Sequence, residues 1–70
     1  MSEYVVIYEE APAGGWGAYL PDLPGVVALG KTREEVGARI EEALAAYVDE
    51  MERQGQTLPQ PVHRAATLRV

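Results

Sequence analysis

The sequence predicts one two-layer α+β domain, in which three short strands, one long helix and a fourth strand follow each other along the chain. Runs of β-branched and aromatic residues come first, clusters of glycine and proline separate them, and an amphipathic stretch follows. This pattern is typical of a sheet that a helix covers on one face. Because 70 residues leave room for a single core, residues 1–70 are assigned to one domain.

The first two strands are predicted to form a hairpin. Residues 3–9 are mostly apolar, with β-branched or aromatic side chains on both faces, as in a strand at the centre of a sheet. Residues 16–20 resume the same composition. The segment between them holds Pro12, Gly14 and Gly15, and a short glycine-bearing connection of this kind predicts a hairpin turn.

A third short strand is predicted at residues 26–29, after a rigid turn. Pro21, Pro24 and Gly25 interrupt the chain before this strand. Proline fixes φ and donates no backbone hydrogen bond, so this connection is expected to lie outside the ladder of the sheet.

A long helix is predicted over residues 33–54. Thr32 and Glu35 have the spacing of a capping box, in which the hydroxyl and the carboxylate each accept a backbone N–H at the helix start. Gly55 stands where a glycine commonly ends a helix. Gly37 lies inside the helix, where glycine is unfavourable, so it indicates either a close approach of the helix to the sheet or a substitution that the helix merely tolerates. Apolar residues recur at spacings of three and four and mark the buried face: Val36, Ile40, Ala43, Leu44, Tyr47 and Met51.

A closing strand is predicted at residues 65–70, after a proline-bearing linker at residues 56–61. A right-handed crossover through the helix would place this strand beside the first one and parallel to it. The predicted sheet order is therefore 3-2-1-4, and a central first strand would explain why its residues are apolar on both faces. Strand three or four at an unprotected edge predicts a homo-oligomer, either a dimer or a dimer of dimers.

Charge and composition favour a basic protein partner in the cytoplasm. Eleven acidic and six basic residues give a net charge of −5, which disfavours direct binding to nucleic acid. The chain has no cysteine, which agrees with a reducing compartment. Its apolar runs are far shorter than the roughly 20 residues of a membrane span, so no membrane association is expected.

Few residues offer catalytic, metal or cofactor chemistry. His63 is the single histidine, and one imidazole without further ligands predicts a solvent-exposed side chain, not a metal centre. A metal-dependent nuclease would need convergent carboxylates such as Glu9, Asp22 and Glu42, which no spacing requires. Asp22, in its proline-rich turn, is expected to accept N–H groups as an Asx turn. The glycines at 14–17 lack a phosphate-binding pattern, so we expect no cofactor and no enzymatic activity.

Two aromatic residues of the second strand are candidate interface anchors. Trp16 and Tyr19 differ by three positions, so in an unbroken strand they point to opposite faces. One of them is expected to face outward, and for Trp16 a place in the core and a place in an interface remain equally open.

The motifs GGWGAYLPDLPG at residues 14–25 and GKTREE at residues 30–35 resemble those of HicB-like antitoxins. With the first strand and the Leu58-Pro59-x-Pro61 stretch after the helix, the resemblance covers nearly the whole chain. Val26 and Val36 depart from the cysteine and alanine that are common in the family, as packing variation would allow. The resemblance implies a β-β-β-α-β, partial RNase H-like fold without the catalytic centre of that enzyme.

The resemblance also implies a function, namely the neutralisation of a HicA-type, mRNA-cleaving toxin by a non-enzymatic module that covers its active site. Many family members carry a further DNA-binding domain, for which this chain has no room, so direct DNA binding is not expected. The alternatives are an orphan regulatory or small-ligand-binding domain and, less favoured, a metal-dependent nuclease. The partner is expected on the sheet surface and the turn at residues 20–25, through five residues: Trp16, Tyr19, Pro21, Asp22 and Pro24.

Overall fold

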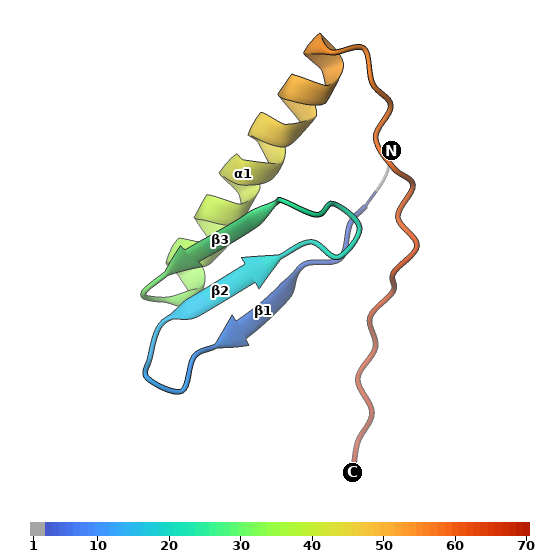
Figure 1. The fold of residues 1–70 in the computed structure, drawn as a ribbon. Coiled ribbons are helices and arrows are strands. Elements are labelled where there is room, and N and C mark those ends of the chain that lie inside the picture. Colours follow the sequence, from blue (N-terminus) through green and yellow to red (C-terminus); the bar gives the residue numbers. More distant parts are fainter. Residues whose placement is uncertain (1–2) are drawn as a thin grey trace.

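The computed structural model describes residues 3–70 and has an α+β fold (Figure 1). Three antiparallel strands form a sheet in the order β1-β2-β3, and one long helix packs against one face of it. The α+β class, the first three strands and the helix are confirmed. The bounds of the elements are β1 Ile7–Glu10, β2 Trp16–Tyr19, β3 Val27–Gly30 and α1 Arg33–Arg53.

The turn between β1 and β2 depends on its glycines. Gly14 and Gly15 have φ values of 95° and 89°, a region in which a side chain would be strained. The Ala11 amide donates to the Gly15 carbonyl at 3.0 Å, and the Gly14 amide donates to the Ala11 carbonyl at 3.0 Å. The predicted hairpin turn is therefore confirmed.

The first strand begins later than predicted, at Ile7 instead of residue 3. In the β1–β2 register Ile7 lies opposite Tyr19, so continuing the ladder would bring Val5 opposite Pro21. Proline has no N–H to donate, so the ladder cannot be continued at that pair. Within the described sheet β1 is an edge strand, which makes the predicted central position wrong.

The turn between β2 and β3 is part of the hydrophobic core. Leu20, Leu23 and Val26 are almost completely buried, with 2%, 0% and 2% of their surfaces exposed. Their backbones are joined by hydrogen bonds from the Leu23 amide to the Leu20 carbonyl and from the Val26 amide to the Leu23 carbonyl, both at 3.1 Å. The turn therefore places the side chain of Leu23 in the core, together with Val36 and Ile40 of α1.

Both ends of α1 carry the caps that the sequence indicates. The Thr32 hydroxyl accepts the Glu35 amide at 3.1 Å, and the Glu35 carboxylate accepts the Lys31 amide at 3.1 Å, one residue before the cap. At the other end Gly55 has a φ of 67°, and the Gln56 amide donates to the Met51 carbonyl at 2.9 Å. These bonds satisfy backbone groups that a helix end leaves unpaired.

The core lies between the sheet and the first half of α1. Val36 and Ile40 of the helix are buried there together with Ala18 of β2 and the leucines of the turn. The second half of α1 extends beyond the sheet, and its apolar residues Leu44 and Tyr47 are only half-buried (Figure 1).

The close approach between helix and sheet occurs at Gly30, not at Gly37. A Cβ atom on Gly30 would lie 2.8 Å from Glu35 Oε1 and 2.9 Å from Val36 Cγ2, which is too close for an ordinary contact. A Cβ atom on Gly37 would lie 3.5 Å from the Tyr8 hydroxyl, an ordinary van der Waals distance. The steric reason for a glycine in the helix is therefore absent at Gly37.

The predicted fourth strand is not formed. Residues 65–70 have no strand structure and are exposed, and the chain after α1 runs in an extended form beside the sheet (Figure 1). The three observed strands lie in the predicted order 3-2-1, but the fourth position beside the first strand is not filled. The RNase H-like topology therefore stays a prediction. After α1 the backbone is held at isolated points, at Pro59, Val62 and His63, instead of by a ladder.

Candidate protein-binding surface

One face of the sheet is apolar and is not covered by the described residues. The register places Tyr8, Ala18 and Ala28 side by side on the face that packs against α1. The residues that alternate with them point to the other side, and we call these the open sheet face: Ile7, Glu9, Gly17, Tyr19, Val27 and Leu29. Exposed apolar surface of this kind is typical of sites that bind other molecules.

The largest exposed side chains on the open sheet face are aliphatic and aromatic. Val27 and Leu29 of β3 have 62% and 75% of their surfaces exposed, and Tyr19 of β2 has 38% exposed. Tyr19 lies directly opposite Val27 in the ladder. Together they present a large aromatic ring next to branched aliphatic groups, a combination that buries much area on contact with a partner.

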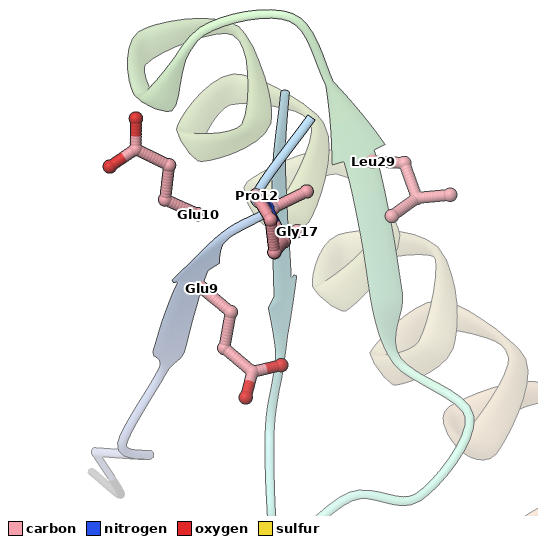
Figure 2. Close-up of a pocket in the computed structure, with 6 residues that line it drawn as sticks. Glu9, Glu10, Pro12, Gly17 and Leu29 are labelled. Carbon is pink, nitrogen blue, oxygen red and sulfur yellow. The ribbon is translucent and has the colours of Figure 1, made fainter. Parts of the chain in front are cut away.

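A shallow hollow of about 390 Å³ lies at one end of this face. Gly17 lines it together with Glu9, Leu29 and the residues Glu10, Ala11 and Pro12 at the start of the turn, and Figure 2 shows the side chains of Glu9 and Leu29 on either side of that glycine. A Cβ atom on Gly17 would lie 3.2 Å from Leu29 Cδ2, so a side chain here would crowd Leu29. The hollow therefore joins an apolar wall to an acidic rim, and its open form suits a protruding side chain of a partner better than an enclosed small ligand.

Trp16 and Tyr19 lie on opposite faces, as predicted. Trp16 is half-buried and packs against the core on the helix side, opposite Gly30. Tyr19 belongs to the open sheet face. The aromatic residue available to a partner is therefore Tyr19.

Asp22 is occupied within the chain. Its side chain is 3% exposed, and its carboxylate accepts the Val62 amide at 3.1 Å and the His63 amide at 3.3 Å. His63 Nδ1 lies 2.6 Å from Oδ1 of the same carboxylate and donates to it, because an ionised carboxylate can only accept. The expected Asx turn is thus replaced by a contact that spans forty-one residues. We call these three contacts the C-terminal anchor.

The C-terminal anchor keeps Asp22 ionised. The hydrogen bond from His63 lowers the pKa of the Asp22 carboxyl below its ordinary value of 3.8, and the two backbone amides act in the same direction. Burial raises the pKa, but it is outweighed. The His63 ring itself is about half exposed, as expected from the sequence.

The structure brings the five predicted partner residues to different places. Tyr19 lies on the open sheet face, whereas Trp16 lies on the face that packs against α1. In the turn between β2 and β3, Pro21 is half-buried and Pro24 is exposed. Asp22 faces the C-terminal segment.

Sequence reasoning missed three apolar residues of the open sheet face, Ile7, Val27 and Leu29. Their signal was the alternation of side chains along each strand, which assigns Val27 and Leu29 to the face that Ala28 does not share.

The part of the chain that the structure describes contains neither a cluster of metal ligands nor a membrane-spanning helix. Over residues 3–70 no three histidine, aspartate or glutamate side chains gather as metal ligands would. In the same range no helix combines the length and the apolar character needed to cross a membrane.

Comparison with known proteins agrees with the motifs. Residues 4–69 match the family model described as HicB_like antitoxin of bacterial toxin-antitoxin system. The chain belongs to the HicB-like antitoxin family. It is also 32% identical over 57 residues to a UPF0150 protein of Thermoplasma acidophilum, an alignment that covers 81% of this chain and 83% of that protein.

The PDLPG motif of this HicB-like chain has a clear structural meaning. Its aspartate, Asp22, holds the C-terminal segment, and its leucine, Leu23, is completely buried in the core. Its glycine, Gly25, has a φ of 100°, a conformation that side chains rarely adopt. The motif that indicates the family therefore stabilises the fold, and the open sheet face lies beside it.

Proposed function

We propose that this HicB-like protein is a non-enzymatic antitoxin that neutralises a HicA-type, mRNA-cleaving toxin in the cytoplasm by covering its active site with the open sheet face. The observation that carries the proposal is the exposed group of Tyr19, Val27 and Leu29 on a sheet whose other face is packed. Family membership supplies the class of partner.

Charge supports the same partner. An enzyme that cleaves mRNA must attract a polyanion, so its active site is expected to be basic. This chain has a net charge of −5, and Glu9 stands at the rim of the hollow on the open sheet face. An acidic, apolar surface placed over a basic active site competes with RNA through charge and excludes it by its bulk.

The contact is proposed to combine one aromatic anchor with aliphatic neighbours. Tyr19 supplies the anchor, Leu29 and Val27 supply apolar area, and Pro21 and Pro24 limit the ordering cost of the adjacent turn. Trp16 and Asp22 are given supporting roles, since the first packs against the core and the second holds the C-terminal segment.

One pair of variants tests the proposal. Leu29→Lys places a positive charge in the centre of the proposed contact, against an active site that is itself expected to be basic, and we expect it to weaken binding to a HicA-type toxin of the same host on the order of 30-fold or more. Val62→Lys is the matched control, because Val62 is equally exposed, at 76%, but lies in the C-terminal segment. Isothermal titration calorimetry measures the affinity, and inhibition of RNA cleavage measures the neutralisation.

Three results would contradict the proposal. The first is equal affinity of Leu29→Lys and the unchanged protein, and the second is an equal loss in both variants. The third is metal-dependent cleavage of RNA or DNA by the purified antitoxin alone, which would restore the nuclease alternative. Thermal melting of both variants shows that neither substitution acts by unfolding.

A further inference from the structure

We infer that residues 64–70, called the tail below, form the fourth strand of the sheet in a second copy of this chain, by pairing with the free edge of β1. Two copies that exchange tails in this way form a closed, twofold-symmetric dimer. The inference is independent of the toxin-binding proposal, because it uses an edge of the sheet and not its open face.

The first observation is that β1 has an unpaired edge. The Ala11–Gly15 hydrogen bond continues the β1–β2 ladder, so alternation makes Glu9 and Ile7 the residues that bond to β2. The N–H and C=O groups of Tyr8 and Glu10 therefore point outward. No described residue pairs with this edge, and a free edge of this kind readily accepts another strand.

The opposite edge of the sheet, on β3, is partly covered. The Arg39 guanidinium of α1 donates to the outward-pointing Leu29 carbonyl at 2.7 Å and is held there beside Glu35 at 3.4 Å. A strand that adds to β3 would have to displace this side chain. The edge of β1 has no such cover among the described residues, so it is the better place for an added strand.

The second observation is that the tail is extended and without partners in the described chain. Among residues 3–70 no hydrogen bond of residues 64–70 is found, and the side chains of Leu68, exposed at 94%, and of Val70 are uncovered. Seven residues in a strand span up to about 23 Å, more than the four residues of β1 need. Addition to a sheet would satisfy its backbone and cover apolar side chains at the same time.

Charge selects the tail for this edge. Arg64 and Arg69 give the tail two of the six basic residues of the chain and none of the eleven acidic ones. β1 ends in Glu9 and Glu10. Pairing of β1 with β1 of another copy would bring these carboxylates together, whereas the tail brings arginine to them.

The anchors explain why the tail pairs with a second copy instead of its own β1. Asp22 holds the chain at Val62 and His63, and the Tyr4 hydroxyl donates to the Pro59 carbonyl at 2.6 Å. With these contacts in place, a hollow of about 440 Å³ separates the start of the tail from the segment before β1. The tail lies on the β1 side of the molecule without joining the sheet (Figure 1). The β1 edge of another molecule is not subject to this constraint.

Sedimentation equilibrium of the full chain at tens of micromolar tests the assembly. We expect a dimer, twice the 7.6 kDa of the monomer, and a shift to monomer in the double variant Thr67→Pro/Leu68→Pro. Adjacent N–H groups of a strand point to opposite sides, so one of the two lost donors would face β1 in any register. Gln60→Pro is the matched control, since Gln60 is exposed and lies outside the tail. Circular dichroism confirms that both variants keep the fold.

Nuclear magnetic resonance of a mixed sample identifies the pairing. Equal amounts of isotope-labelled and unlabelled chain should give intermolecular contacts between Tyr8 or Glu10 of one copy and the tail of the other. A monomer, a dimer that Thr67→Pro/Leu68→Pro leaves intact, or tail contacts to β1 that are purely intramolecular would each overturn the inference. Because toxin affinity is measured separately on Leu29→Lys, failure here and failure of the proposed function are distinguishable.

Discussion

Asp22 and His63 are joined by a 2.6 Å contact between Oδ1 and Nδ1, although forty-one residues separate them in the sequence. The aspartate lies in the turn between β2 and β3, and the histidine lies in the extended segment after α1. This contact, with the two backbone amides that the same carboxylate accepts, fixes the direction in which the C-terminal segment leaves the domain.

The C-terminal anchor predicts a specific loss of stability in acid. The pKa of Asp22 is lowered in the folded protein, so the folded state binds fewer protons than the unfolded state near the ordinary value of 3.8. The stabilisation from this carboxylate is therefore fully present above that pH and is lost as the pH falls through the folded pKa.

Thermal melting of the unchanged protein and of Asp22→Asn between pH 7 and pH 2 measures this loss. The unchanged protein should melt higher at neutral pH, and the difference between the two should shrink in acid. A difference that stays constant over the whole range would show that the charge of Asp22 contributes nothing.

Trp16 and Tyr19 should respond to alanine substitution in opposite ways. Trp16→Ala removes a half-buried ring that packs against the core, and we expect the free energy of unfolding to fall by about 2 to 3 kcal/mol. Tyr19→Ala should leave stability nearly unchanged but weaken toxin binding by about 2 kcal/mol. Urea denaturation and calorimetry measure the two effects, and the reverse pattern would place the anchor at Trp16.

Gly30 and Gly37 should also respond to alanine substitution in opposite ways. Gly37→Ala should stabilise the protein by up to about 1 kcal/mol, because alanine is the better helix former and its methyl group meets only the Tyr8 hydroxyl, at 3.5 Å. Gly30→Ala should destabilise it, because the methyl group would press on Glu35 and Val36 at less than 3.0 Å. Denaturant unfolding of both variants checks the signs, and destabilisation by Gly37→Ala would restore the expected close approach there.

The parts of the fold that depend on near neighbours could be predicted from the sequence. The glycine turn after β1, the Thr32 cap and the Gly55 terminus each follow from residues a few positions apart, and all three are present. The opposite orientation of Trp16 and Tyr19 followed from strand geometry in the same way.

The features that depend on distant parts of the chain could not be predicted. Nothing in the sequence around Asp22 indicates that its partner is His63, and the Asx turn was the simpler local solution. The steric role of Gly30 arises from the packing of α1 on β3, which no local pattern encodes. The tail has the composition of a strand but does not pair with the edge that the topology rule assigned to it, and the contacts that place the start of the tail are made with Asp22, far away in the sequence.

The order of elements along the chain also bears on the order in which the protein folds. Each strand pairs with the next one in the sequence, and α1 packs on the two strands that immediately precede it. Folds built from such local contacts form rapidly, because little loop entropy is lost before contacts are gained. The sheet, its open face and the packing of α1 on it therefore need no residue beyond Arg53. A surface for a toxin can thus exist before the segment that is proposed to join two copies has found its partner.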